Sequence, residues 1–196
     1  MTDLPPLPKK DWLLVRVGPS RAAWDRSERP AHVERAGPGE ESVWDYPRPP
    51  ELRPAPGRAR VVHGGCEIAS SDRALRMVET AGAPVYLLPP EDVRMGLLVP
   101  NDHVTVCEWK GAAVHFDLVM PDLRVRDAAF AYPDPLDDLG QGYGRIAGWI
   151  AFYPSRVEAC FVGDEQVRPQ PGGYYAGWVT DAIKGPIKGD PGTEGW

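Results

Sequence analysis

The stretch that decides the fold is Thr105–Gly111, which reads TVCEWKG. Within it, Thr105 and Cys107 fall on one side of an extended chain and Val106 falls on the other, which is the side-chain spacing of a β-strand. The strand runs into a Trp-Lys-Gly turn. We therefore expect a hairpin whose end carries an aromatic ring, a thiol and an ammonium group, a combination suited to the wall of a pocket.

Short apolar stretches separated by turn residues recur on both sides of this segment. Gly64 and Gly65 would join two of them as a hairpin, and Pro121 and Asp122 separate two others. Consecutive short strands with tight turns predict a mostly β fold with antiparallel sheets. The predicted strands are Arg60–His63, Glu67–Ala69, Val85–Leu88, Val104–Trp109, Val114–Val119, Val125–Tyr132, Ile146–Tyr153 and Val157–Val162.

One or two short helices are expected among these strands. The longer one would begin after Ser71, a suitable N-cap, and end before Gly82. Leu75 and Glu79 would share one face of this helix because they lie four residues apart. A single further turn is expected at Pro90, since proline suits the first helical position.

Proline and glycine, with 23 and 21 residues, are concentrated in dense clusters, mainly near the two ends of the chain. Proline lacks the amide donor and glycine costs backbone entropy, so these parts predict arms and linkers. We expect an N-terminal arm over residues 1–41, a core domain over 42–169 and a tail over 170–196 that packs on the core. In the arm, Trp12–Val17 could add one strand. The tryptophans expected to pin loose segments onto the core, or else to grip a partner, are Trp12, Trp24, Trp44 and Trp178.

The formal net charge of −6 and the pI near 5.2 describe an acidic chain. Nucleic acids and anionic membranes are polyanions, so neither is attracted to an acidic surface. No apolar run approaches the roughly 20 residues that cross a bilayer, and the first residues lack the basic and apolar regions of a signal peptide. We expect a cytosolic protein whose partner is a small molecule or another protein, including a second copy of this chain.

The cysteines Cys66, Cys107 and Cys160 are widely spaced and form no Cys-x-x-Cys pair. This spacing is typical of reduced thiols rather than of a disulfide framework or a structural zinc site. The sequence therefore predicts no disulfide, no metal and no cofactor.

Five ordered blocks of the chain resemble the bacterial domain-of-unknown-function family 427. They are Ser42–Pro50, Pro89–Met95, Cys107–Gly111, Ala131–Pro135 and Ile150–Pro154. The resemblance implies a β-tent fold, in which two antiparallel sheets meet at a steep angle, as in the ligand-binding domain of cereblon and in B-type methionine sulfoxide reductases. Those relatives hold zinc with two Cys-x-x-Cys pairs, which this chain lacks, so neither their metal nor their chemistry carries over.

The family also carries a nucleotidyltransferase-like label, but this chain shows no Gly-Ser followed by paired aspartates. The chain departs from the family pattern at three positions. Glu108 stands where the family has proline and could pair with Lys110. Leu87 replaces a frequent tyrosine, and His115 replaces an aromatic residue.

The resemblance and the turn together predict a ligand-holding cleft between two sheets, in which Lys110 holds an anion or a carbonyl against aromatic rings. No catalytic residue is assigned. The candidate ligand-binding residues are Glu79, Tyr86, Asp92, Cys107, Trp109, Lys110, Tyr132 and Tyr153.

Two other classes of function stay open. In an enzyme, Glu79 could act as a base, or Cys107 could act as a nucleophile opposite His115, with Thr105 facing Asp117 in the same register. Asp92 more simply faces the amides of the turn that begins at Pro90. In a protein-interaction module, the tryptophan-bearing arms would grip a partner.

Overall fold

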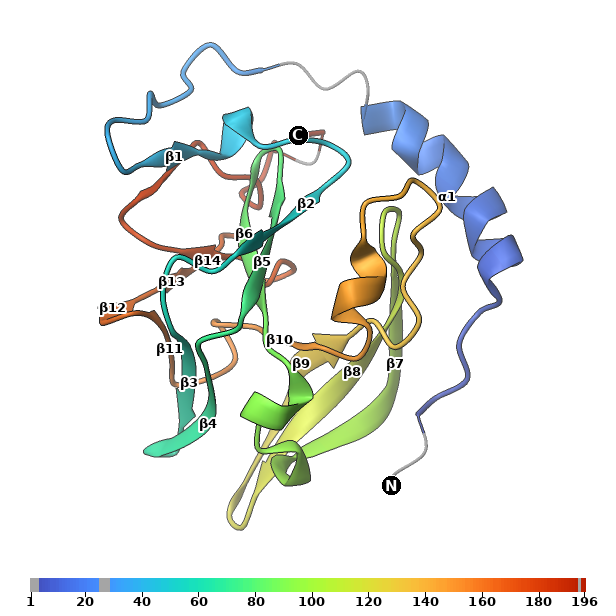
Figure 1. The fold of residues 1–196 in the computed structure, drawn as a ribbon, viewed down its shortest axis with the longest axis vertical. Coiled ribbons are helices and arrows are strands. Elements are labelled where there is room, and N and C mark those ends of the chain that lie inside the picture. Colours follow the sequence, from blue (N-terminus) through green and yellow to red (C-terminus); the bar gives the residue numbers. More distant parts are fainter. Residues whose placement is uncertain (1–3, 25–28, 194) are drawn as a thin grey trace.

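The structure is a computed structural model that describes residues 4–24, 29–193 and 195–196. Figure 1 shows short and long strands in several sheets, with one α-helix, α1 (Lys10–Trp24), along one flank. Four short 3-10 helices lie between strands, namely η1 (Val43–Asp45), η2 (Pro90–Asp92), η3 (Met95–Leu97) and η4 (Tyr143–Ile146). The strands of the described chain are β1 (Glu41–Ser42), β2 (Glu51–Pro54), β3 (Ala59–His63), β4 (Cys66–Ser71), β5 (Leu75–Glu79), β6 (Gly82–Leu87), β7 (Leu98–Cys107), β8 (Gly111–Met120), β9 (Leu123–Ala131), β10 (Ile150–Phe152), β11 (Ala159–Val162), β12 (Glu165–Gln166), β13 (Arg168–Pro169), β14 (Trp178–Val179) and β15 (Ile183–Lys184).

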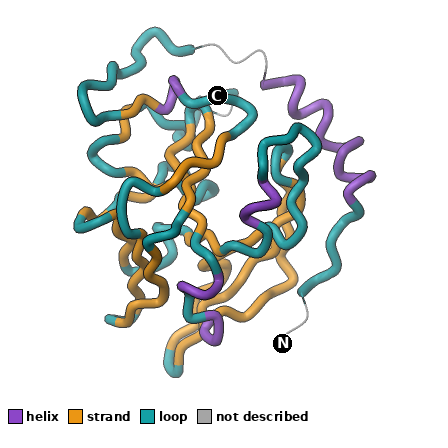
Figure 2. Tube along the Cα trace, viewed as in Figure 1, coloured by secondary structure: helices purple, strands orange, loops and turns teal. Residues whose placement is uncertain are grey.

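The larger sheets are all antiparallel. The long sheet has the strand order β10-β9-β8-β7, the short sheet has the order β2-β5-β6, and the third sheet has the order β12-β11-β3-β4. Two strand pairs complete the structure, β13 with β14 and the parallel pair of β1 with β15. Figure 2 shows the strands, in orange, joined by extensive loops and turns, in teal. The prediction of a mostly β fold with antiparallel sheets is confirmed.

Two apolar clusters share the long sheet, one on each face. On β8, Val114 and Leu118 belong to the cluster that also contains Val61 of the third sheet, whereas Ala113 belongs to the cluster that contains Met77 of the short sheet. The period of two residues along β8 therefore sends alternate side chains to opposite faces. His115 falls on the same side as Ala113, which faces the short sheet.

Most predicted strands are present. Gly64 and Gly65 join β3 to β4, with His63 opposite Cys66, so the first hairpin is confirmed. β8 covers its predicted segment, β9 covers its predicted segment except Tyr132, and η2 begins at Pro90 as expected. The segment predicted as a strand over Ile146–Tyr153 is shorter, because its first residue ends η4 and only Ile150–Phe152 pairs with β9.

The helix predicted between Ser71 and Gly82 is wrong, because this segment forms β5 and the start of β6. All residues from Leu75 to Val78 are buried, as expected for the central strand of a sheet that is covered on both faces. Leu75, Val78 and Glu79 in this segment also satisfy helical spacing, which explains the error. Ala81 adopts a φ of 66° in the turn that reverses the chain into β6.

The strand predicted over Trp12–Val17 is also wrong, because these residues lie in α1. Leu13 and Val17 lie four residues apart and pack with Ala112 and Leu136 in a small apolar cluster. This face of the helix covers the turn at the end of β7 and β8. Trp12 lies on the other side of the helix with 51% of its surface exposed, so it does not pin the arm to the core.

The tail beyond residue 169 packs against β6. The side chain of Gln170 is the main link, because its Oε1 accepts a hydrogen bond from the Ala83 amide at 3.0 Å and its Nε2 donates to the Lys188 carbonyl at 2.9 Å. Trp178 in β14 is fully buried. These contacts hold the tail against the short sheet. The domain boundaries at 41 and 169 stay a prediction.

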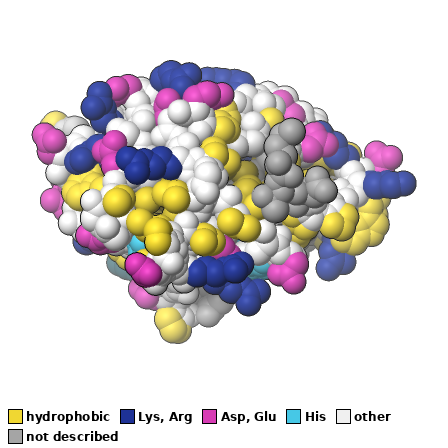
Figure 3. Space-filling view, turned by 90° about the horizontal axis from the view of Figure 1, so that it is seen from below, with side chains coloured by type: hydrophobic (Ala, Val, Ile, Leu, Met, Phe, Trp, Pro, Cys, Tyr) yellow, Lys and Arg dark blue, Asp and Glu magenta, His cyan; other side chains and the backbone are white. Residues whose placement is uncertain are grey.

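The surface mixes charges of both signs. Figure 3, which views the molecule from below relative to Figure 1, shows Lys and Arg side chains interspersed with Asp and Glu around a band of apolar groups. None of the helices in the described ranges has the length and apolar character needed to cross a membrane.

Candidate functional site

A cavity of about 360 Å³ lies between the long sheet and the short sheet. Its walls come from β5 and β6 of the short sheet, from β7, β8 and β9 of the long sheet, from the tail, and from the end of α1. We call it the inter-sheet cavity. The residues that line it are Trp24, Met77, Glu79, Gly82, Ala83, Val85, Leu87, His103, Thr105, Val106, Cys107, Glu108, Lys110, His115, Phe130, Tyr132, Tyr153, Arg156, Gln170, Tyr174, Tyr175, Ala176 and Lys188.

One wall follows from the alternation along β7. His103, Thr105 and Cys107 lie two residues apart and all line the cavity, as the spacing of a strand requires. From the neighbouring strand β8, His115 adds an imidazole whose Nε2 lies 3.0 Å from Thr105 Oγ1. Burial, the largest influence, and the adjacent His103 lower the pKa of His115 to about 4, so this ring is neutral at neutral pH.

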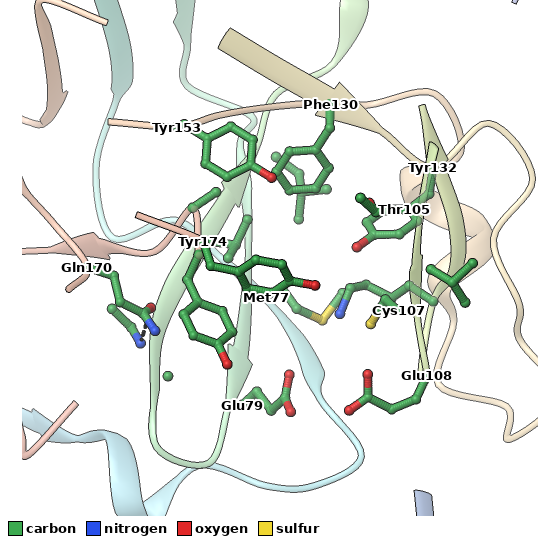
Figure 4. Close-up of a pocket in the computed structure, with 18 of the residues that line it drawn as sticks. Met77, Glu79, Thr105, Cys107, Glu108, Phe130, Tyr132, Tyr153, Gln170 and Tyr174 are labelled. Atoms are coloured by element: carbon green, nitrogen blue, oxygen red, sulfur yellow. Dashed lines mark hydrogen bonds between the residues drawn. The ribbon is translucent and has the colours of Figure 1, made fainter. Parts of the chain in front are cut away.

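Aromatic rings form the next part of the wall. Phe130 lies 5.3 Å from Tyr153 and 5.8 Å from Tyr132, measured between ring centroids. Figure 4 shows the three side chains together at one end of the cavity. Burial raises the pKa of Tyr153 to about 12 and holds that of Tyr132 well above its ordinary value. Both phenols therefore keep their protons and can donate hydrogen bonds to a bound molecule.

Lys110 ends the turn between β7 and β8. Gly111, the next residue, has a φ of 84°, which glycine adopts without strain, and the Lys110 carbonyl accepts the Leu136 amide at 3.0 Å. The Lys110 ammonium lies 5.7 Å from the centroid of the Tyr132 ring. Burial alone lowers the pKa of Lys110, but the neighbouring Cys107 and Glu79 outweigh it and hold the pKa above its ordinary value. The side chain is therefore a cation at neutral pH.

Among the residues that the structure describes, no carboxylate forms an ion pair with Lys110. The expected ion pair between Glu108 and Lys110 is not formed. The carboxylate of Glu108 accepts a hydrogen bond from Trp24 Nε1 instead, and its backbone carbonyl accepts one from Arg21 at 2.6 Å. The helix α1 thus holds Glu108 at the edge of the cavity.

Glu79 has cationic partners. Its Oε1 lies 3.5 Å from Arg48 Nε and 3.7 Å from Lys188 Nζ, and all these side chains are less than one fifth exposed. The Lys188 ammonium also lies 5.1 Å from the Tyr175 ring centroid. In the view of Figure 4, the carboxylates of Glu79 and Glu108 point into the cavity from opposite walls.

The structure brings together five of the residues predicted from the sequence. Glu79, Cys107, Lys110, Tyr132 and Tyr153 all line the inter-sheet cavity.

The other predicted residues, Tyr86, Asp92 and Trp109, do not line it. Tyr86 points to the opposite face of β6 and is buried in the main apolar cluster. Asp92 holds its own turn, because its carboxylate accepts hydrogen bonds from Ser71 at 2.6 Å and from Arg73 at 2.9 Å. Trp109 is buried beneath Arg21, whose guanidinium carbon lies 5.5 Å from the ring centroid.

The predicted pairing of Cys107 with His115 is wrong. Cys107 pairs with Gly111, and Thr105 pairs with Ala113 rather than with Asp117, because the turn holds three residues. His115 lies four residues beyond Gly111 on β8, which is about 13 Å at about 3.3 Å per residue. The two side chains share the cavity without forming a thiol and imidazole pair.

Several cavity residues were missed. His103 continues the alternation of Thr105 and Cys107 by one step, so strand spacing alone could have found it. The residues of the tail follow no periodic pattern, and nothing in the sequence assigns them to this wall. The missed tail residues are Gln170, Tyr174, Tyr175, Ala176 and Lys188.

The geometry defines a mostly β protein with a small cavity between two antiparallel sheets. A family described as "Domain of unknown function (DUF427)" matches residues 51–163, which is more than half of the chain, and the protein belongs to this family. The matched region begins with β2 and ends just after β11, so it contains the short and long sheets but not Trp24 or the tail. No curated protein matches the chain.

Proposed function

We propose that the protein binds a flat, anionic small molecule in the inter-sheet cavity. Lys110 would hold the anionic group, and the rings of Phe130, Tyr132 and Tyr153 would contact the flat part. The observation that carries this proposal is a half-buried, protonated lysine beside an aromatic wall. A desolvated ammonium attracts an anion more strongly than an exposed one, because less water screens the charge.

The size of the cavity supports a small molecule. Its volume of about 360 Å³ lies at the lower end of the range of roughly 300–1,000 Å³ that is usual for ligand pockets. The wall combines apolar side chains with a few polar groups, the composition that gives both affinity and orientation. An aromatic carboxylate matches this arrangement, with its ring on the tyrosines and its carboxylate on Lys110.

The same geometry supports binding over catalysis. Lys110 is protonated, so it lacks the free amine that a covalent step would need. Glu79 has Arg48 and Lys188 near its carboxylate, which favours a structural ion pair over a proton acceptor. Cys107 has no histidine partner within its strand register to activate the thiol.

The test is a binding assay with matched ligand pairs. Benzoate, nicotinate and indole-3-carboxylate are titrated by calorimetry, each beside its neutral amide. We expect at least one carboxylate to bind and its amide to bind at least about tenfold more weakly, a difference of roughly 1.4 kcal/mol. Lys110→Met should remove this preference. Asp92→Asn is the control, because Asp92 lies outside the cavity and should leave the affinity unchanged.

Two outcomes would contradict the proposal. Equal affinity for carboxylate and amide would show that Lys110 does not recognise the charge. Conversion of a ligand to product, lost in Glu79→Gln or Cys107→Ser, would favour the enzyme alternative instead. Correct folding of each variant is checked by its far-ultraviolet circular dichroism.

Helix α1 supports the interaction alternative, with a second copy of the chain as the partner. Trp12 and Val15 lie on its outer side and are 51% and 81% exposed. Analytical ultracentrifugation tests this alternative directly. Concentration-dependent association that is lost in Trp12→Ser would establish it, whereas a monomer at all concentrations would exclude it.

A further inference from the structure

His103, His115 and Asp127 lie on three neighbouring strands, β7, β8 and β9. One ligand atom from each side chain lies within 4.8 Å of the others. The two imidazole rings stack with 4.1 Å between their centroids, and His103 Nδ1 lies 3.2 Å from Asp127 Oδ2. His103 and Asp127 both lie where the register of their strand with β8 shifts, so these irregularities bring their side chains beside His115.

We propose that these three residues bind one divalent transition-metal ion, with Zn²⁺ or Fe²⁺ as the ions best suited to the donor set. Two imidazoles and one carboxylate favour such ions over Mg²⁺ or Ca²⁺, which prefer oxygen ligands. The sequence predicts no metal, because its cysteines lack paired spacing. The proposed site uses none of the cysteines.

His115 gives independent support. The side chain is 1% exposed, and its Nδ1 is buried without a hydrogen-bond partner. The other ring nitrogen, Nε2, lies 3.0 Å from Thr105 Oγ1. When Nε2 donates to that hydroxyl, the lone pair of Nδ1 is left available, which is how a second residue orients a metal-binding histidine. A metal ion would supply the partner that Nδ1 lacks.

Further contacts fix the carboxylate. Asn101 Nδ2 donates to Asp127 Oδ1 at 2.9 Å and to Asp117 Oδ1 at 2.6 Å. The Asp127 amide donates to Asp117 Oδ1 at 3.0 Å, and Asp127 itself has a φ of 50°. This network leaves Oδ2 of Asp127 on the side of His103. Outer contacts of this kind hold metal ligands in place.

The distances between the three ligand atoms are compatible with one metal ion once the imidazole rings turn. With metal-to-ligand distances of about 2.0–2.2 Å, neighbouring ligand atoms lie about 3–3.5 Å apart. The pair of His103 and Asp127 already meets this value, at 3.2 Å. The widest separation is at most 4.8 Å and needs to close by about 1 Å. The two imidazole planes lie 21° apart in the stack, so the rings must also turn until both nitrogen lone pairs point at the ion.

The proposed site borders the inter-sheet cavity. His103 and His115 line the cavity, whereas Asp127 does not. Three protein ligands leave a coordination position for water or a ligand atom. That position would face the cavity at the end away from Lys110. His103 lies four residues before Cys107 on β7, whereas Lys110 follows Cys107 in the turn. Metal binding is therefore independent of the proposed role of Lys110.

Calorimetric titration of the tag-free protein, treated with a chelator and then dialysed, tests this site. We expect Zn²⁺ and Co²⁺ to bind with one ion per chain, and Mg²⁺ to bind at least about 100-fold more weakly. His115→Ala and Asp127→Asn should each weaken Zn²⁺ binding at least about 100-fold. His32→Ala is the matched control, since it removes an exposed histidine outside the cluster. The visible absorption of bound Co²⁺ reports nitrogen ligation.

Three further variants distinguish ligand positions from general charge effects. Thr105→Val should weaken Zn²⁺ binding about tenfold, because it removes the contact with His115 Nε2, and Thr105→Ser should restore it. Arg126→Ala should strengthen Zn²⁺ binding, because it removes a positive charge whose Nε lies 3.8 Å from Asp127 Oδ2. The Arg126 side chain is 74% exposed.

The proposal is overturned if Zn²⁺ does not bind at about 1 mM, if Mg²⁺ binds equally well, or if His115→Ala retains the wild-type affinity. Lys110→Met should keep full Zn²⁺ affinity. A failure of the metal site is thereby distinguishable from a failure of anion binding at Lys110.

Discussion

The indole of Trp178 lies against the ring of Tyr86, with 4.8 Å between the ring centroids and 21° between the ring planes. Tyr86 belongs to β6 and Trp178 belongs to β14 in the tail. The indole Nε1 also donates to the Phe152 carbonyl of β10 at 3.1 Å. One side chain therefore fastens the tail to both the short and the long sheet, and so keeps the tail residues at the cavity wall.

Trp178→Ala should lower the free energy of unfolding by about 3–5 kcal/mol, the usual cost of replacing a buried aromatic residue with alanine. Trp12→Ala is the control, because Trp12 is 51% exposed and its loss should change stability by less than about 0.5 kcal/mol. Urea unfolding followed by circular dichroism measures both. Similar effects for the two variants would contradict the assignment of Trp178 as the anchor.

Gly177 should tolerate no side chain. A Cβ there would lie 2.1 Å from Gln170 Oε1 and 2.9 Å from Ala83 Cβ, so Gly177→Ala must push the tail away from β6. We expect a loss of about 1–3 kcal/mol in the free energy of unfolding, as for other overpacked positions. Gly96→Ala, with no atom within 4 Å of the new Cβ, should be neutral. Thermal unfolding curves of the two variants give the comparison.

Glu41 and Arg76 should make stability depend on pH. The Glu41 carboxylate accepts hydrogen bonds from Arg76 at 2.7 Å and from Tyr46 at 2.8 Å. Burial raises the pKa of Glu41, but these hydrogen bonds outweigh it and lower the pKa below its ordinary value. The stabilisation is therefore fully present above the unfolded-state pKa of about 4.3 and is lost as the pH falls through the folded-state pKa.

Glu41→Gln should accordingly cost about 1–3 kcal/mol at pH 7, because it leaves the buried Arg76 without its charged partner. The two proteins should converge in stability below the folded-state pKa of Glu41. Urea unfolding between pH 7 and pH 2 measures the difference. A difference that stays constant over this range would show that the charge of Glu41 is not involved.

Glu79→Gln should strengthen the binding of an aromatic carboxylate. The substitution removes a negative charge from the cavity wall and leaves the positive charges of Lys110 and Lys188 in place. We expect affinity to rise about threefold to tenfold, or roughly 0.7–1.4 kcal/mol. Calorimetry with the carboxylate found for the wild-type protein gives the value. Weaker binding in Glu79→Gln would mean that Glu79 contacts the ligand directly.

The sequence predicts β7 well and β5 poorly. Along β7, Thr105 and Cys107 alternate with Val106, and this period identifies the strand. Along β5, every residue from Leu75 to Val78 is buried, so the alternation disappears and the run fits a helix equally well. The register of β7 with β8 was missed because it depends on the number of residues in the turn, which the alternation does not determine.

The candidate site was predictable only where sequence neighbours form it. Lys110 and Cys107 lie in the segment that decides the fold, and both line the cavity. Tyr86 was misplaced because one step along a strand reverses the face of a side chain. Lys188 could not be found, since its position depends on Gln170 and other long-range contacts of an irregular tail.

The Lys188 ammonium lies 5.4 Å from the centroid of the Trp24 ring, and neither residue belongs to the region that matches the family. This side of the cavity is thus supplied by segments that flank the shared sheets. Family members with different flanks would keep the same apolar cores while replacing one boundary of the binding space. Under the proposed function, ligand preference would then differ between members without cost to the folding of the common scaffold.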